Sequence, residues 1–197
     1  MFRLIDRPQS ECVTHHQGIP VRVYTGDVQD ERIRASKDTV AIALSEIGRR
    51  AHIIELCCGT ADICGPFAEQ HKVLGIDCNV GAIEKARERF IEGIFMVGEV
   101  EKATPALFDV LILCETLEHI DKPFKLVTDW LPSCRYSVIS HPIDEPMGSG
   151  ESGGDHCWSY SDGDFDHWFK LGGHELIFNR EIRVGGYRIR IGLGKRL

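Results

Sequence analysis

From residue 52 onward, short apolar runs alternate with helix-length segments, and this alternation constrains the fold more than any other feature of the chain. The runs are rich in Val, Ile and Leu and lie at 52–58, 72–78, 93–99, 108–115 and 136–143. Uninterrupted runs of this kind are typical of parallel strands buried on both faces. Segments of helical length separate or follow them, at 61–71, 79–90, 123–131 and 162–172. The alternation predicts a doubly wound α/β fold, with a mostly parallel sheet between two helical layers.

The two ends of the chain depart from this alternation. Residues 174–184 and 187–194, separated by Gly185 and Gly186, predict an antiparallel hairpin that closes the sheet at seven strands. The N-terminal 50 residues contain one expected helix, from about Asp30 to Arg50. We expect this helix to cap the sheet or the mouth of a ligand site.

Charge and hydropathy narrow the range of partners. The formal net charge of −7 argues against a large nucleic-acid footprint, although residues 178–197 carry six Arg or Lys and one acid. No apolar run approaches the roughly 20 residues of a membrane helix. Charges interrupt the first residues, MFRLIDRPQSEC, so no secretory leader is predicted. We therefore expect no membrane partner and a cytoplasmic protein whose thiols stay reduced.

Eight cysteines raise the question of a metal or redox role. Cys57, Cys58 and Cys64 fall within eight positions, yet no Cys-x-x-Cys pair exists in the chain. Four of them, Cys57, Cys58, Cys78 and Cys114, lie at the ends of apolar runs, where a thiol behaves as a small hydrophobic group. Packing is the favoured interpretation.

The turn after the first run has the order of a ligand-binding elbow. Glu55 lies in the first run, Gly59 follows in the turn, and about 20 residues later Asp77 lies near the end of the second run. A glycine allows close backbone approach to a ligand, and a carboxylate at the second position can accept hydrogen bonds from both ribose hydroxyls. The alternative for Asp77 is a helix N-cap. Because neither G-x-x-x-x-G-K-[ST] nor G-x-G-x-x-G is present, the pattern indicates a nucleotide-like cofactor without a cradled pyrophosphate.

With these residues the sequence resembles the class I S-adenosylmethionine-dependent methyltransferases, over about residues 50–195. The first motif of that family reads [DE]-x-G-x-G-x-G, and this chain has Glu55-Leu56-Cys57-Cys58-Gly59-Thr60-Ala61. Cys57 and Ala61, both small, stand at the first and third glycine positions. The resemblance implies a seven-stranded Rossmann-like fold and S-adenosylmethionine as the cofactor. The length of the chain predicts one domain over 1–197, with a helical cap at 1–50 and a cofactor-binding core at 51–197.

The resemblance also assigns roles around the cofactor. Asp77 would bind the ribose, Cys78 would lie beneath the adenine, and Glu99 would lie near the adenine amino group. A solvated loop acid is the alternative for Glu99. Cys114 and Glu115 would face the methionine end. The full expected cofactor set is Glu55, Cys57, Gly59, Thr60, Ala61, Asp77, Cys78, Glu99, Val100, Cys114 and Glu115.

Two further segments carry groups suited to catalysis. Methyl transfer from a sulfonium is an in-line displacement, and an oxygen nucleophile benefits from a general base or a metal. Residues 114–120 follow the fourth run, and residues 155–160 resemble the family's His-x-Trp-x-[FY] segment. We expect Glu118, His119 and His156 to be the catalytic residues.

Three interpretations of these segments stay open. In small-molecule methyltransferases similar to those of quinone biosynthesis, the His would be a base or contact the substrate. In the small-RNA 3′-end 2′-O-methyltransferases, the matching positions bind a divalent ion, here Glu115, Glu118, His119 and His156; such ligands suit Mg²⁺ or Mn²⁺. The segment could also only support its loop. His141 could face the pocket, whereas His167 and His174 suit a helix surface and a strand start.

We expect methyl transfer to a small-molecule acceptor, with oxygen as the favoured atom. Metal-dependent RNA 3′-end 2′-O-methylation is the second hypothesis. It ranks below the first because the chain is acidic and carries no appended RNA-binding module, both of which are unfavourable for binding RNA. A non-catalytic cofactor-binding interaction domain is the third, and Cys57 and Ala61 favour it. The Gly/Ser-rich segment 144–155 is predicted to be a lid. No sequence pattern indicates the acceptor's identity or the oligomeric state.

Overall fold

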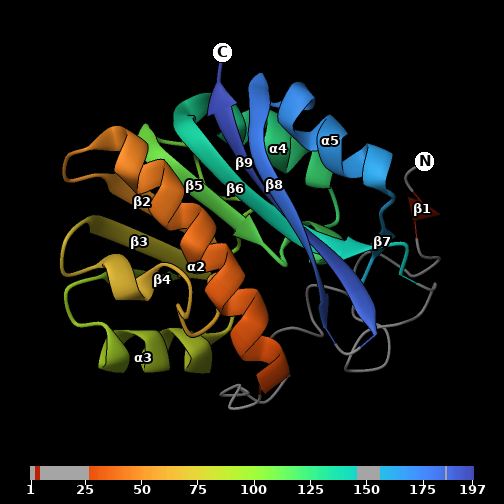
Figure 1. Ribbon diagram of the computed structural model, residues 1–197. Helices are drawn as coiled ribbons and strands as arrows, with labels where there is room; N and C mark the ends of the chain where they lie inside the picture. Colours follow the sequence, from red (N-terminus) through yellow and green to blue (C-terminus); the bar gives the residue numbers. More distant parts are fainter. Residues whose placement is uncertain (1–2, 5–26, 146–155, 185) are drawn as a thin grey trace.

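A computed structural model of the chain describes residues 3–4, 27–145, 156–184 and 186–197. Its centre is a seven-stranded sheet (Figure 1) with the order β4-β3-β2-β5-β6-β9-β8. Only β9 runs antiparallel to its neighbours, β6 and β8. The strands are β2 (His52–Leu56), β3 (Lys72–Asp77), β4 (Ile94–Val97), β5 (Phe108–Cys114), β6 (Cys134–Ile143), β8 (His174–Val184) and β9 (Tyr187–Arg196). The expected fold class, including the C-terminal hairpin, is confirmed.

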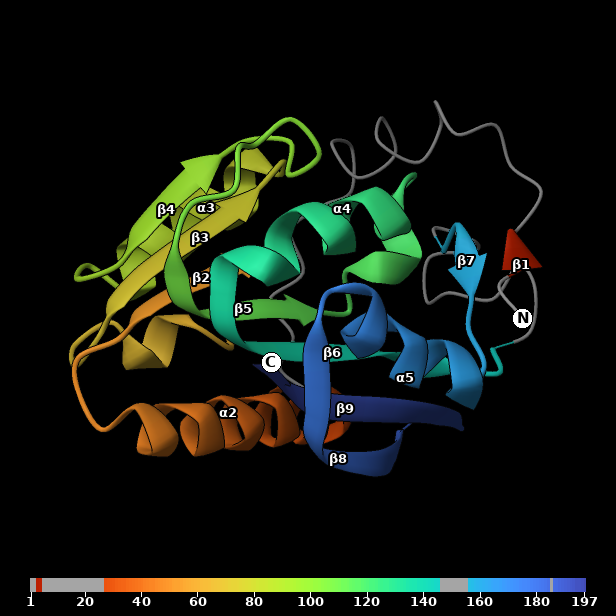
Figure 2. The same ribbon diagram turned by 90° about the horizontal axis from the view of Figure 1, so that it is seen from above.

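Helices cover both faces of the sheet, which gives three layers. One apolar cluster joins the sheet to α2 (Asp27–Ile47), α3 (Val80–Arg89) and the 3₁₀ turn η1 (Gly65–Phe67). The other joins it to α4 (Pro123–Trp130), α5 (Asp162–Leu171) and two 3₁₀ turns, η2 (Leu117–His119) and η3 (Leu131–Ser133). Figure 2 shows α2 and α4 on opposite sides of the sheet. No helix among the described residues is long and apolar enough to cross a membrane.

The strand order defines where a ligand can bind. β2 pairs with β3 on one side and with β5 on the other, all three in parallel. Ligands of open α/β sheets bind beyond the carboxyl ends of the strands at such a switch point. The loops that follow β2 and β5 both begin there, and they carry residues 57–61 and 115–119.

One predicted helix is wrong. Residues 61–71 contain only the single 3₁₀ turn η1. Pro66 has no backbone N–H to donate, and the amide of Cys64 donates to the Glu55 carboxylate at 3.0 Å. A Cβ on Gly65 would lie 2.3 Å from the ring of Phe90, so this segment packs closer than a side-chain-bearing helix could.

The N-terminal helix is present as α2 and lies across one face of the sheet (Figure 1). Arg180 of β8 donates to the carbonyl of Ala35, and Arg32 forms an ion pair with Glu115 at 3.1 Å. The helix therefore contacts both the sheet and the loop after β5. The division of the domain at residue 50 stays a prediction. Of the predicted lid, residues 146–155 lie outside the described residues.

Candidate active site

The loop after β2 has left-handed backbone at three alternate positions. The φ angles are 57° at Cys57, 53° at Gly59 and 59° at Ala61. These are the three glycine positions of the motif [DE]-x-G-x-G-x-G, which residues 55–61 resemble. A non-glycine residue in this region costs roughly 1–2 kcal/mol, and such strain concentrates at functional sites. The loop therefore keeps the shape of a glycine loop without two of the glycines.

Glu55 holds this loop from behind. Its side chain is buried and accepts the hydrogen bond from the Cys64 amide. Burial raises the pKa of Glu55 to about 8, and the hydrogen bond from Cys64 opposes that rise. The structure shows Glu55 bound to the chain itself, and its contact with a cofactor stays a prediction.

Asp77 joins the end of β3 to the same loop. Its Oδ2 accepts from the Gly59 amide at 2.8 Å, and its Oδ1 accepts from the Asn79 amide at 2.8 Å. The N-cap of α3 is Asn79, whose Oδ1 accepts from the Ala82 amide, so the capping alternative for Asp77 is wrong. Each carboxylate oxygen has a second lone pair, which leaves capacity for further donors.

The other expected cofactor residues lie along the same edge of the sheet. Cys78 follows β3, Glu99 and Val100 follow β4, and Cys114 ends β5. Glu99 is half-buried and forms an ion pair with Lys102 at 2.7 Å. Thr60 is buried, and its hydroxyl lies 2.5 Å from the Asp62 carboxylate. Their contacts with a cofactor stay predictions.

Six of the described cysteines behave as packing residues. Burial raises the pKa of each of these thiols: Cys57, Cys58, Cys64, Cys78, Cys114 and Cys134. A thiol with a raised pKa is a poor nucleophile and a poor metal ligand near neutral pH. The cysteine-rich stretch after β2 thus serves the loop and the core.

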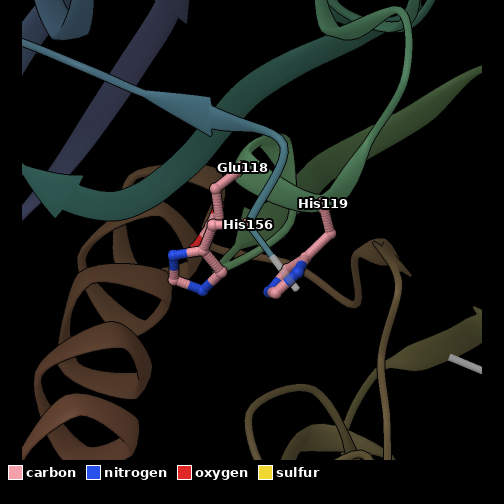
Figure 3. Close-up of side chains that lie close together, drawn as sticks. All are labelled: Glu118, His119 and His156. Atoms are coloured by element: carbon pink, nitrogen blue, oxygen red, sulfur yellow. The ribbon is translucent and has the colours of Figure 1, made fainter. Parts of the chain in front are cut away.

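A second group of side chains gathers beyond β5. Glu118 and His119 lie on η2, and His156 lies just before β7 (Trp158–Ser159) (Figure 3). One possible ligand atom from each of the three lies within 4.8 Å of the others. The rings of His119 and His156 are edge to face, with centroids 4.6 Å apart.

Hydrogen bonds fix the two segments of this cluster to each other. The Cys157 amide donates to the Glu118 carbonyl at 2.7 Å. The Trp158 indole donates to Ile120 O at 2.9 Å, and the Tyr160 hydroxyl donates to Leu117 O at 2.8 Å. Segments nearly forty residues apart in the sequence are thereby held in one arrangement.

Glu118 has an unusual environment for a carboxylate. It is 1% exposed, and within the described part of the chain neither carboxylate oxygen has a hydrogen-bond partner. Burial raises the pKa of Glu118 well above its usual value; the charge of Glu115 adds to the rise and that of His156 opposes it. A buried carboxylate without donors is costly unless a proton or a cation compensates it. One carboxylate and two imidazoles form a donor set that fits a divalent ion.

Glu115 is not part of this cluster. Its Oε2 pairs with Arg32 at 3.1 Å, and its Oε1 accepts from the Ser140 hydroxyl at 3.0 Å. Of the four residues in the metal hypothesis, the structure brings together Glu118, His119 and His156.

Comparisons with known proteins agree with this architecture. Residues 53–131 match the family model described as a methyltransferase domain. That match contains the loop after β2, Asp77 and the Glu118-His119 pair. Over residues 53–131 the chain therefore matches a methyltransferase domain.

Solved methyltransferase structures share the fold of this chain. Magnesium protoporphyrin IX methyltransferase from Synechocystis PCC 6803, with bound SAH, has a TM-score of 0.73 at 14% identity, covering 96% of this chain and 93% of that one. The N-methyltransferase NodS from Bradyrhizobium japonicum WM9, with SAH, has 0.72 at 12%, covering 95% and 98%. A 1,6-didemethyltoxoflavin-N1-methyltransferase from Burkholderia thailandensis has 0.70 at 16%, covering 99% and 94%. The comparison with curated proteins gave no match.

Sequence reasoning about the candidate site missed Glu145. Its Oε2 lies 2.5 Å from Nδ1 of His156, and it is buried. The sequence feature that could have revealed Glu145 is its position: it is an acid two residues beyond the end of β6, at the edge of the sheet where the other site residues lie. The Gly/Ser-rich composition of the surrounding segment drew the interpretation toward a lid instead.

His141 does not face the pocket, contrary to expectation. It is fully buried beside Tyr160 and Phe165, where Nδ1 donates to Pro142 O at 2.9 Å and Nε2 accepts from the Trp168 indole at 3.2 Å. Burial lowers the pKa of His141 to about 4. The other two expectations are confirmed: His167 is exposed on α5, and His174 begins β8.

Proposed function

We propose that this methyltransferase transfers the methyl group of S-adenosylmethionine to an oxygen atom of a small-molecule acceptor. One observation carries the proposal: Glu118, His119 and His156 cluster beyond β5, next in the sheet to β2, whose loop keeps the shape of a cofactor loop. The cofactor and the proton-accepting groups would then meet at the switch point of the sheet.

Asp77 and the loop after β2 would bind the cofactor. The remaining lone pairs of the Asp77 carboxylate suit the two ribose hydroxyls, while its bonds to the Gly59 and Asn79 amides already fix its orientation. The left-handed backbone at 57, 59 and 61 would let the chain approach the cofactor closely.

Transfer breaks the bond between the sulfonium sulfur and the methyl carbon and forms a carbon–oxygen bond. S-adenosylhomocysteine leaves, and the hydroxyl proton passes to a base. His119 and His156 are the groups whose ordinary pKa suits a base near neutral pH. Alignment of donor and acceptor would supply much of the remaining acceleration.

Small-molecule acceptors gain support from proteins of the same fold. The solved structures include enzymes whose names state protoporphyrin or toxoflavin derivatives as substrates. The acidic net charge of −7 is consistent with such acceptors and unfavourable for a large RNA footprint. The catalytic cluster argues against a domain that only binds the cofactor.

A second candidate is metal-dependent 2′-O-methylation of an RNA 3′ end. The partnerless Glu118 carboxylate beside two imidazoles favours it, because Glu118, His119 and His156 would hold a divalent ion. Such an ion would lower the pKa of an acceptor hydroxyl. The ion pair of Glu115 with Arg32 counts against the full four-residue site.

Calorimetry with S-adenosylhomocysteine, with and without Mn²⁺, tests the proposal. We expect micromolar binding of the cofactor product, and no binding would contradict the enzyme proposal. A Mn²⁺-dependent heat lost in Glu118→Gln would favour the metal candidate. With an acceptor in hand, His119→Ala and His156→Ala should lose turnover, and His167→Ala on α5 is the matched control that should not.

A further inference from the structure

We propose that Glu145 is a positioning residue for His156, which it holds in the tautomer that presents a lone pair on Nε2. The inference deepens the proposed function and rests on it, because His156 matters to the reaction only if the cluster acts on the acceptor. The contact is direct: Oε2 of Glu145 lies 2.5 Å from Nδ1 of His156.

The pair is shielded from water. The Glu145 side chain is 5% exposed and the His156 side chain 12%. An exposed ion pair contributes little, but a buried carboxylate must have its hydrogen bonds satisfied and holds its partner in a defined geometry. The contact thus orients the imidazole more firmly than a surface pair would.

The backbone on both sides of the contact is also fixed. The Ser159 hydroxyl donates to the Glu145 carbonyl at 2.9 Å, and the Asp144 amide donates to the Tyr160 carbonyl at 2.7 Å. The end of β6 and the segment that carries His156 are therefore joined by main-chain as well as side-chain bonds. These bonds keep Glu145 beside His156, so that its carboxylate can orient the imidazole.

The chemistry of the two groups determines the tautomer. An ionised carboxylate only accepts hydrogen bonds, so Nδ1 must carry the proton that it shares with Glu145. A neutral imidazole that is protonated at Nδ1 has its lone pair on Nε2. Both a general base and a metal-ligating imidazole need such a lone pair, and carboxylates commonly orient histidines in both settings. Glu145 serves either version of the reaction.

Nitrogen NMR of histidine-labelled protein tests the tautomer without any acceptor. At about pH 8, where an ordinary imidazole is neutral, we expect His156 to be protonated at Nδ1 and unprotonated at Nε2. His156→Ala assigns the signals. In Glu145→Ala the Nε2-protonated form should rise from minor to major. Glu145→Gln should keep the original tautomer, because its amide oxygen accepts the same hydrogen bond.

The matched control is Asp144→Ala, which removes the neighbouring carboxylate and its ion pair with Arg188 and should leave the His156 signals unchanged. A wild-type ring protonated at Nε2 would overturn the proposal, and the only variant that this measurement needs is His156→Ala, which assigns the signals. An unchanged tautomer in folded Glu145→Ala would overturn it as well. Cofactor calorimetry on the same samples separates this outcome from failure of the proposed function, since the tautomer does not depend on S-adenosylhomocysteine binding.

Discussion

At the scale of single residues, the loop after β2 keeps the backbone shape of a glycine loop although two of its three glycine positions carry other residues. Cys57 and Ala61 hold left-handed φ angles that glycine would adopt without strain. Because the bonds to Glu55 and Asp77 anchor the loop on both sides, the fold compensates for this strain. Of the three left-handed positions in this loop, only position 59 carries a glycine, which adopts such a φ angle without strain.

Gly59→Ala is therefore expected to lower the free energy of unfolding by about 1 kcal/mol, the left-handed penalty less the entropy that glycine loses on folding. A Cβ at Gly59 would meet no atom within 4 Å, so the cost is one of backbone alone. Urea denaturation measures it. Gly48→Ala is the matched control, with φ 64° and equally open space at the end of α2. Both should lose stability, but only Gly59→Ala should weaken S-adenosylhomocysteine binding; equal affinity in both would refute a cofactor role for the loop.

Asp77→Asn should raise the Kd of S-adenosylhomocysteine at least about tenfold, since hydrogen bonds to a charged group contribute roughly 1.5–3 kcal/mol. Calorimetry gives the value directly. The control is Asp109→Asn: Asp109 accepts from the His52 amide at 2.9 Å and pairs with Arg49, near the opposite ends of the strands. Asp109→Asn should change stability and leave the Kd alone. An unaltered Kd in Asp77→Asn would remove Asp77 from the cofactor site.

Residue-level prediction from the sequence succeeded where a motif fixed the position. His119 and His156 were expected together and lie with their rings 4.6 Å apart. His141 was misplaced because strand alternation does not reveal which face of β6 packs against Tyr160 and Trp168. The partner of His156, Glu145, could not be found because side-chain pairing depends on the tertiary path of the chain.

At the scale of elements, the cluster of Glu118, His119 and His156 depends on the attachment of η2 to the segment around β7. A 3₁₀ turn of three residues has little stability of its own. Its position comes from the hydrogen bonds that Cys157, Trp158 and Tyr160 make to it. The geometry of Glu118 and His119 is thus set by residues from a distant part of the sequence.

Tyr160→Phe should lower the free energy of unfolding by about 1 kcal/mol, because it removes the shorter of the two hydrogen bonds to the Leu117 carbonyl and leaves only the one from the Ile120 amide at 3.4 Å. Tyr136→Phe makes a matched control. The Tyr136 hydroxyl is buried and, among the described residues, has no hydrogen-bond partner. Its removal should be neutral or stabilising. Urea denaturation that finds equal losses in the two variants would show that the bond to η2 contributes nothing.

The difference between locally and distantly determined conformation also explains which elements the sequence predicted. The seven strands of the main sheet and α3, α4 and α5 were expected near their observed bounds, because their apolar periodicity is local. The segment 61–71 looked helical in length and composition, yet it forms only η1. Its conformation is decided by the bond from the Cys64 amide to Glu55 and by close packing on Phe90, neither of which a local pattern encodes.

At the scale of the whole molecule, buried acids and buried histidines oppose each other in the dependence of stability on pH. A carboxyl whose folded pKa is raised supports the fold below its unfolded pKa and loses that contribution as pH rises through the folded value. Glu55, with a pKa of about 8, and Glu118 act in this direction. Burial lowers the pKa of His141 to about 4 and also lowers the pKa of His174, so these groups lose their contribution as pH falls below about 6.5.

Between about pH 6.5 and pH 8 each unfolded-state histidine releases only its last half proton, which adds about 0.4 kcal/mol of stability per buried histidine, so the acids dominate. The free energy of unfolding should fall over this window by on the order of 1–2 kcal/mol from Glu55 alone, since one unit of pKa difference corresponds to about 1.4 kcal/mol. Urea denaturation at the two pH values measures the fall, and Glu55→Gln should make it smaller. Glu175→Gln, on the exposed start of β8, should keep the wild-type dependence. If Glu55→Gln and the wild type fall by the same amount, Glu55 is ionised in the folded protein at neutral pH, and its hydrogen bonds from Cys64 must then balance a buried negative charge beneath the loop after β2.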